Sequence, residues 1–348
     1  MTETRERLGW TEHFAAAFEP YEAEGLRPGR VAVQHRGAYD LYTEDGETRA
    51  EPSGRMRHDA TGAGDLPAAG DWVAFRDGVI HAVLPRTTKF SRKAAFTEAE
   101  EQVVAANVDG VFLVTSLNAD LNLRRLERYL TLGWESGAMP AIVLTKADLS
   151  DDVAADVAEV ESVAFGTPIH AVSNVTGDGL DQLEPYFTGN RTVALLGSSG
   201  VGKSTLINRL VGEELLLTNE IRESDGRGRH TTTRRELILL PRGGLVLDTP
   251  GMRELQLWDA GEGIGTAFED VEALAAECRF ADCGHVTEPG CAVQAAVDSG
   301  TLALDRLRSY RKLLRELRAL EVRQDQRLQA EARRKRRVQA RSYRKVKW

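Results

Sequence analysis

The 348-residue sequence has no run of eighteen or more apolar residues, so it predicts no helix that spans a membrane. Its opening, Met-Thr-Glu-Thr-Arg-Glu-Arg, lacks the apolar segment of a secretory signal, and we therefore expect a cytoplasmic protein without a membrane contact. Cysteine is scarce, because the three cysteines of the chain all lie between residues 278 and 291. The apolar content of 42% is nevertheless enough for a substantial core, and the length allows two or three domains.

Positive charge is in deficit over the chain as a whole but is concentrated at one end. The formal net charge is −8, yet residues 323–348 carry eleven Lys and Arg against Asp325 and Glu331. This segment therefore has a local charge of +9, and the remainder of the chain is near −17. A basic tail on an acidic body indicates a polyanionic partner that the protein meets with one end.

A glycine-rich stretch at 197–204 fits the phosphate-binding pattern G-x-x-x-x-G-K-[ST]. An apolar run precedes it and helical apolar spacing follows it, which is the strand–loop–helix setting of this motif. Lys203 is expected to reach the β- and γ-phosphates, and Ser204 to bind Mg²⁺. The alternative is a Gly/Ser turn with a chance lysine. The predicted nucleotide-binding residues here are Gly197, Ser198, Ser199, Gly200, Val201, Gly202, Lys203, Ser204 and Thr205.

The N-terminal part reads as short strands separated by turn signals such as Asp45-Gly46 and Asp77-Gly78. Several such strands in a short stretch favour a small barrel of the OB type, with a mobile loop over residues 50–70. Two interpretations of its cationic and aromatic residues stay open: a nucleic-acid surface, or a solvated barrel face with a core tryptophan. These residues are Arg30, Arg36, Tyr39, Arg55, Arg57 and Trp72.

After Pro85 the pattern changes to strands that alternate with helices. Apolar runs at 111–114, 141–144 and 169–172 predict buried strands, and helical spacing follows the first two of them. This alternation predicts a parallel sheet covered by helices on both faces.

Two of these strands end in residues suited to binding a nucleotide base. Thr145-Lys146-Ala147-Asp148 resembles the Asn-Lys-x-Asp element of GTPases, in which the carboxylate accepts hydrogen bonds from guanine N1–H and the N2 amino group. Ser173-Asn174 resembles the Ser-Ala loop that closes over the base. Thr145 and Asn174 depart from the pattern, and a surface turn is the alternative interpretation of the tetrad.

The segment 221–233 is rich in Gly and Arg and is expected to be the first switch, in which Thr232, or alternatively Thr231, binds Mg²⁺. Asp248-Thr249-Pro250-Gly251 matches Asp-x-x-Gly; Asp248 is expected behind the Mg²⁺ ion, and the Gly251 N–H is expected to face the γ-phosphate. In an ordinary GTPase the base-binding elements come last, whereas here they come first. The sequence therefore predicts a circularly permuted GTPase domain, which a parallel sheet tolerates when the old termini lie close.

The cysteines form a further constellation with a histidine. Cys278, Cys283, His285 and Cys291 have the spacing C-x4-C-x-H-x5-C, which is typical of a closed tetrahedral Zn²⁺ site. Such a site is structural and would hold together a small helical module. Buried free cysteines beside a surface histidine are the alternative.

The permuted order, the Gly-Arg-His-Thr-Thr-Thr segment ending at residue 233 and the Cys/Cys/His/Cys spacing together resemble the ribosome small subunit-dependent GTPase A (RsgA) family. The resemblance implies a multidomain α/β chain: an N-terminal extension and OB-fold β-barrel at 1–88, a circularly permuted P-loop GTPase domain at 89–257, and an α-helical zinc-binding domain with a basic tail at 258–348. It also implies GTP and GDP binding, late maturation of the small (30S) ribosomal subunit, and contact with 16S rRNA. We expect one structural Zn²⁺, Mg²⁺ bound with GTP, and a monomer.

One absence bears on the hydrolysis of GTP. Many GTPases place a glutamine after Asp-x-x-Gly to orient the attacking water, but this chain has Met252, which cannot serve. The family pattern points to His230 of the first switch, with hydrolysis stimulated by the small subunit and acting as a release switch. Two alternative functions remain: an RNA-binding assembly protein that uses nucleotide only for order, and a P-loop ATPase or kinase.

Overall fold

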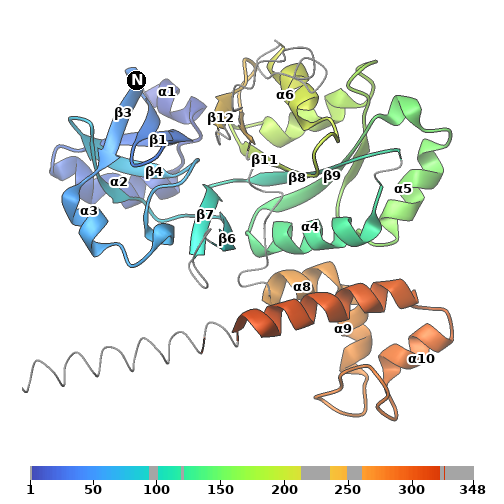
Figure 1. The fold of residues 1–348 in the computed structure, drawn as a ribbon. Helices are drawn as coiled ribbons and strands as arrows, with labels where there is room; N and C mark the ends of the chain where they lie inside the picture. Colours follow the sequence, from blue (N-terminus) through green and yellow to red (C-terminus); the bar gives the residue numbers. More distant parts are fainter. Residues whose placement is uncertain are drawn as a thin grey trace, which may run out of the picture.

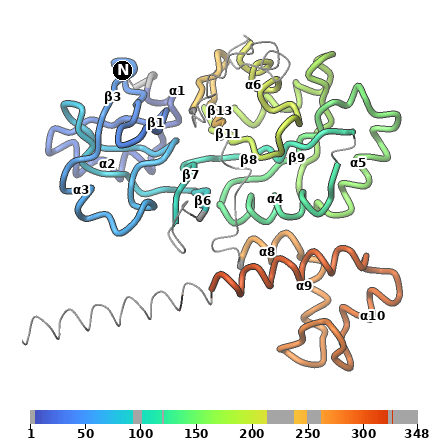
Figure 2. Tube along the Cα trace, in the orientation of Figure 1, coloured from blue at the N-terminus to red at the C-terminus, as the bar shows by residue number. Residues whose placement is uncertain are grey.

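The computed structural model describes residues 2–93, 101–118, 121–212, 236–248, 261–321 and 325. Figure 1 shows a barrel, a sheet flanked by helices, and a group of helices beneath the sheet. Figure 2 traces the same course from the N-terminal barrel to the C-terminal helices. Among the described residues, no helix combines the length and the apolar character needed to cross a bilayer.

The central strands are β8 (Gly110–Ser116), β9 (Met139–Thr145), β10 (Ile169–Ala171), β11 (Thr192–Leu196), β12 (Glu236–Leu239) and β13 (Leu245–Asp248). Their order across the sheet is β10-β9-β8-β11-β13-β12, and all neighbouring pairs are parallel except β12 and β13. The predicted mostly parallel sheet is therefore confirmed. Strand β11, which leads into the glycine-rich loop, lies between β8, which precedes it in the chain, and β13, which follows it.

The apolar run of β8 is buried on both faces because successive side chains point to opposite sides of the sheet. Val111 and Leu113 join the core beneath helix α4 (Leu123–Glu135). Phe112 and Val114 join the opposite core beneath helix α6 (Lys203–Val211). Figure 1 shows α4 and α6 on opposite faces, and α5 (Val153–Glu161) beyond α4. The helix η3 (Leu180–Phe187) adds Leu183 and Phe187 to the core on the α6 side, and the short helix η2 (Ala147–Leu149) follows the end of β9.

The N-terminal barrel consists of β1 (Arg27–Gln34), β2 (Tyr39–Thr43), β3 (Gly46–Pro52), β4 (Trp72–Arg76) and β5 (Val79–Val83). Pairing runs β1-β2-β3-β5-β4, and β4 returns to β1, so the barrel closes. Residues 50–70 are not a simple loop, because they include the end of β3, helix α3 (Gly54–Asp59) and η1 (Ala63–Asp65). Two helices precede the barrel, α1 (Thr2–Arg7) and α2 (Glu12–Ala23).

The nucleic-acid interpretation of the barrel needs correction at three residues. Arg30, Tyr39 and Trp72 are only 1%, 3% and 1% exposed, so none of them can present a surface to a partner. Trp72 is a core tryptophan, packed edge-on against Trp10 with ring centroids 4.6 Å apart. Arg36, Arg55 and Arg57 are exposed.

Arg30 instead joins the barrel to the central sheet. Its guanidinium donates to the carbonyl oxygens of Leu8, Gly70 and Asn107, and to Thr192 Oγ1 at 2.8 Å. Thr192 is the first residue of β11, so one side chain connects the N-terminal segment and the barrel to the strand that precedes the glycine-rich loop. Burial lowers the pKa of Arg30 to about 10, which leaves the group charged at neutral pH.

Backbone pairing makes the same connection at the sheet edge. Strand β1 pairs with β12 in antiparallel orientation, with Val33 opposite Glu236, so barrel and sheet form one eleven-stranded array. The hydroxyl of Tyr42 donates to the carbonyl of Leu237 at 3.0 Å. The small sheet of β6 (Lys89–Lys93) and β7 (Glu101–Ala106) lies where the barrel meets the central sheet (Figure 1).

The C-terminal helices are α8 (Gly261–Ala267), α9 (Glu269–Ala276), α10 (Ala292–Asp298) and a last helix at 304–321. They pack beneath α4 (Figure 1). Contact is close at Gly263, where an added Cβ would lie 2.4 Å from the carbonyl oxygen of Thr131. Arg306 of the last helix donates to Glu127 Oε1 of α4 at 2.8 Å and to Asp270 of α9 at 2.7 Å.

We predict that Arg306→Met destabilises the protein by about 3–5 kcal/mol, because it leaves the carboxylate of Glu127, 2% exposed, without its cation. Arg308→Met, in the same helix but in an exposed ion pair, is the control and should leave the unfolding midpoint unchanged. The measurement is thermal or denaturant unfolding of the full chain. Equal midpoints for the two variants would show that the buried pair does not hold the C-terminal helices.

Candidate nucleotide and metal sites

The glycine-rich loop leaves the end of β11 and enters α6 at Lys203. Gly197 packs so closely on the neighbouring strand that an added Cβ would lie 2.3 Å from the carbonyl oxygen of Val114. Gly200 and Gly202 have φ angles of +80° and +92°, which favour glycine and allow the backbone to curl. The ammonium of Lys203 donates to the carbonyl oxygens of Gly197 and Ser198, 2.6 Å and 2.5 Å away, so its charge lies within the loop.

The other predicted nucleotide-binding residues lie along the same loop and the helix after it. Ser198, Ser199 and Val201 belong to the curled segment, and Ser204 and Thr205 to the first turn of α6. Backbone N–H groups at the start of a helix have no partner within it and favour an anion. The segment is thus suited to phosphate groups.

The two predicted base-binding elements meet at the same edge of the sheet. Ser173 Oγ donates to Asp148 Oδ1 at 2.5 Å and accepts from the N–H groups of Val175 and Thr176. Lys146 has a left-handed φ of +60° and leads into the short helix η2, which carries Ala147 and Asp148. Both elements follow the carboxyl ends of the parallel strands β9 and β10, where open α/β sheets bind ligands.

Asp248 lies at the same edge, because it ends β13 and is in register with Leu195 of β11. The described structure therefore brings together the phosphate loop, the base elements and the Asp-x-x-Gly aspartate. His230, Thr231, Thr232, Gly251 and Met252 lie outside the described residues.

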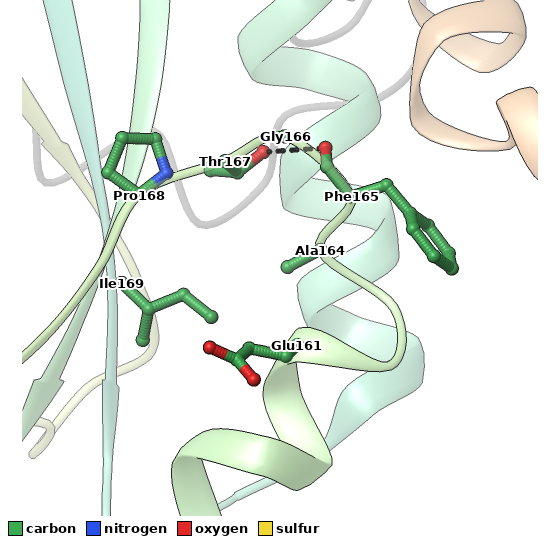
Figure 3. A pocket seen from close by; sticks show the side chains of 7 residues that line it. All are labelled: Glu161, Ala164, Phe165, Gly166, Thr167, Pro168 and Ile169. Atoms are coloured by element: carbon green, nitrogen blue, oxygen red, sulfur yellow. Dashed lines mark hydrogen bonds between the residues drawn. The ribbon is translucent and has the colours of Figure 1, made fainter.

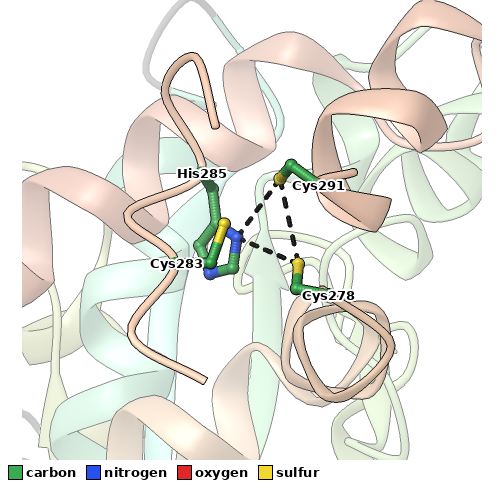
Figure 4. Close-up of side chains that lie close together, drawn as sticks. All are labelled: Cys278, Cys283, His285 and Cys291. Atoms are coloured by element: carbon green, nitrogen blue, oxygen red, sulfur yellow. Dashed lines mark hydrogen bonds between the residues drawn. The ribbon is translucent and has the colours of Figure 1, made fainter. Parts of the chain in front are cut away.

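The cysteines and histidine come together as the spacing predicts (Figure 4). One ligand atom from each of Cys278, Cys283, His285 and Cys291 lies within 4.8 Å of all the others. His285 Nδ1 is 3.6 Å from the sulfur of Cys278 and 3.5 Å from that of Cys291. Three thiols and an imidazole nitrogen that converge on one point suit a tetrahedral Zn²⁺ site, so the residues present fit this metal.

Residues around the cluster shape it. His285 has a left-handed φ of +53°, and the side chain of Gln294 donates to its carbonyl oxygen at 2.6 Å. The carboxylate of Glu288 accepts from the N–H groups of Val286, Thr287 and Gly284. These hydrogen bonds lower the pKa of Glu288 to about 2, and the bond from the N–H of Val286 has the largest effect. The loop therefore keeps a charged acceptor at neutral pH.

Sequence spacing did not indicate Gln294, Glu288 or Arg209, although each contacts a site loop. Arg209 of α6 donates to the carbonyl oxygens of Asn174 and Val175 at 2.7 Å and 3.0 Å. Side-chain bonds to backbone groups, whether to carbonyl oxygens as for Gln294 and Arg209 or from N–H groups as for Glu288, leave no periodic signal, so only the fold identifies these residues.

A surface cavity of about 460 Å³ lies apart from both sites (Figure 3). It is lined by residues 161 and 164–169, between the end of α5 and the start of β10. Within this lining, Thr167 Oγ1 donates to the Phe165 carbonyl at 3.5 Å, and the N–H of Thr167 donates to the carbonyl of Ala164 at 3.1 Å. Because it adjoins the amino end of β10, it is at the edge opposite the nucleotide elements and takes no part in them.

Comparison with known proteins agrees with this geometry. A family model described as RsgA GTPase matches residues 83–258. A protein named small ribosomal subunit biogenesis GTPase RsgA from Opitutus terrae is 49% identical over 90% of this chain and 89% of its own length. A protein of the same name from Streptomyces coelicolor is 48% identical over 93% of this chain and 90% of its own length.

Two crystal structures share the fold. YjeQ from Thermotoga maritima is 29% identical, with a TM-score of 0.62 over 84% of this chain and 98% of that one. YloQ, described as a circularly permuted GTPase, is 26% identical, with a TM-score of 0.58 over 84% of this chain and 96% of that one. With the five elements in permuted order and this degree of similarity, the chain belongs to the RsgA GTPase family and is a GTP hydrolase of the circularly permuted fold.

Proposed function

We propose that this GTPase binds the small (30S) ribosomal subunit, assists its late maturation and uses hydrolysis of GTP as the signal for release. The main support is that the phosphate loop, the base elements and Asp248 lie at one edge of the sheet. In addition, the relatives of this chain are named for small-subunit biogenesis. We propose further that the protein acts in the cytoplasm and as a monomer.

Each part of the nucleotide has a proposed partner. Asp148, oriented by Ser173, accepts from guanine N1–H and the N2 amino group, which adenine lacks at those positions. The stem of Lys146 lies along the base, and the phosphates receive the loop N–H groups and Lys203. Ser204, Thr232 and Asp248 are the proposed residues that hold Mg²⁺, which would neutralise charge that develops on the phosphate oxygens.

Hydrolysis needs a polar group to orient water, and the methionine at 252 cannot supply it. We propose that His230 does so once the subunit orders the first switch, while the N–H of Gly251 faces the γ-phosphate. The ribosome-stimulated reaction then reports that the subunit has been engaged.

Contact with 16S rRNA is proposed for the exposed cations of the barrel and for the basic tail. Arg36, Arg55 and Arg57 are exposed, and phosphate contacts by such side chains need no sequence specificity. In this proposal RNA is bound by the two outer predicted domains, 1–88 and 258–348, which flank the GTPase domain at 89–257 in the sequence. The alternative is an RNA-binding protein in which bound nucleotide only orders the fold. Such a protein would show no increase in GTP hydrolysis when small subunits are added.

Zinc is the metal that we propose for the Cys278, Cys283, His285 and Cys291 cluster. A bound Zn²⁺ would link a segment that has few apolar residues of its own, so its role is structural. The sulfur of Cys291 also accepts the N–H of Gln294 at the start of α10, which orients this ligand.

Asp148→Asn should weaken GTP binding and shift preference toward xanthosine nucleotides, because the amide replaces one acceptor with a donor. Asp178→Asn is the matched control, since among the described residues its exposed carboxylate bonds only Thr176 of the same loop. Equilibrium binding of GTP and XTP measures both variants. Unchanged GTP affinity in Asp148→Asn would remove Asp148 from the base site.

Elemental analysis should find one zinc per chain, and Cys283→Ser should contain none. Without the metal, the C-terminal helices of this variant should no longer unfold as one cooperative unit. Asp282→Ser, an exposed neighbour of the ligand, should retain the metal. Folded wild-type protein free of zinc would contradict the assignment.

His230→Ala should leave GTP affinity and subunit binding nearly intact but reduce ribosome-stimulated turnover by about 10²-fold, as expected for the loss of a group that orients water. The control is His170→Ala, whose ring contacts Gln182 and Tyr186 away from the phosphate loop. Steady-state hydrolysis is measured against 30S concentration. Full stimulation of the His230 variant would mean that the ribosome supplies the group in trans.

A further inference from the structure

Thr145 and Asn174 are the two positions at which the base elements depart from the Asn-Lys-x-Asp and Ser-Ala patterns. Both side chains are buried, at 0% and 7% exposure, and both reach the phosphate loop. Thr145 Oγ1 donates to the carbonyl oxygen of Val201 at 2.5 Å. Asn174 Nδ2 donates to the carbonyl oxygen of Gly202 at 3.2 Å.

The two bonds hold consecutive peptide groups of the loop. In a trans peptide the C=O of one residue points opposite to the N–H of the next. Fixing the carbonyl groups of Val201 and Gly202 toward the base elements therefore turns the N–H groups of Gly202 and Lys203 to the other side. Those are the donors that a phosphate-binding loop offers to its anion.

Gly202 shows how closely the two side chains converge. Its φ of +92° is a left-handed conformation, and an added Cβ would lie 3.1 Å from Asn174 Nδ2 and 3.7 Å from Thr145 Oγ1. The turn immediately before Lys203 is thus enclosed by side chains from the base elements. A different tilt of this turn would break both bonds.

The main chain of Asn174 is itself anchored. Arg209, six residues after Lys203 in α6, donates to the carbonyl oxygens of Asn174 and Val175. The base loop is therefore attached both to the start of the phosphate-binding helix, through the Asn174 amide, and to its end, through Arg209. Movement of either loop must move the other.

A contribution to folding stability does not explain why position 174 is an asparagine. Its Oδ1 is buried and finds no donor among the residues that the structure describes, and a buried acceptor without a donor costs free energy. Alanine, the residue of the pattern, would carry no such cost. The benefit of Asn174 must then come from where its Nδ2 bond places the loop.

We infer that Asn174 is a positioning residue which, with Thr145, fixes the phosphate loop in its anion-binding form and supplies the amide that position 145 lacks. Arg209 holds Asn174 in place for this purpose. The inference rests on the proposed nucleotide site and deepens it, because it makes phosphate affinity depend on a residue of the base loop.

Asn174→Ala should weaken GDP and GTP binding about five-fold or more, the usual effect of one lost hydrogen bond, and leave guanosine binding unchanged. Asn174→Asp, of the same shape but without the Nδ2 donor, should weaken GDP binding further, because its carboxylate faces a carbonyl oxygen. Thr176→Ala is the control, since within the described part of the chain its hydroxyl bonds only Asp178 of the same loop. The probes are guanosine, GDP and GTP in equilibrium and dissociation measurements on the full chain.

Lys203→Ala separates the failure of this inference from the failure of the proposed site. If Lys203→Ala loses GDP affinity while Asn174→Ala stays within two-fold of wild type, the positioning role is wrong and the site stands. Equal loss of guanosine and GDP affinity in Asn174→Ala would also overturn the role, because it would place the side chain in the base pocket. If Lys203→Ala binds GDP as wild type, the nucleotide site itself is wrong.

Discussion

Hydrogen bonding of β11 to β8 on one side and to β13 on the other is the constraint on which the nucleotide site depends. Parallel pairing brings the carboxyl ends of these strands, and of β9 and β10, to one edge. The order in which the chain visits the strands does not matter for that edge. A permuted chain therefore keeps the site as long as the strand neighbours are kept.

Two buried arginines join the outer units to this sheet. Arg30 connects the barrel and the N-terminal segment to β11, and Arg306 connects the C-terminal helices to α4. Burying a guanidinium is unfavourable unless its donors are satisfied, and here each of them bonds several acceptors. Such contacts specify one arrangement of neighbouring units more sharply than an apolar surface does. The units are therefore held in defined positions around the nucleotide edge.

The sequence predicted what rests on local pattern. The loop glycines, the apolar strands and the spacing of Cys278 to Cys291 each constrain nearby backbone, so they indicated the phosphate loop, the sheet and the metal cluster. Helices α1 and α2 were not predicted: α1 is polar, and α2 contains Pro20, although its buried Phe14 and Phe18 have helical spacing. Arg30 was expected on a surface because an arginine in a strand gives no sign of partners up to 162 residues away. The departures at 145 and 174 acquired meaning only when their distances to the phosphate loop were known.

The pairing of β1 with β12 has a consequence for synthesis of the chain. All five barrel strands precede residue 84, so the barrel can form early, but β12, which pairs with the end of β1 at Val33, begins only at Glu236. Until β12 emerges, the end of β1 around Val33, beyond the residues that pair with β4, is an edge to which another strand can add. A nascent or truncated chain that ends before β12 is therefore the form most exposed to aggregation, and this edge is covered only when residues 236–239 have been translated.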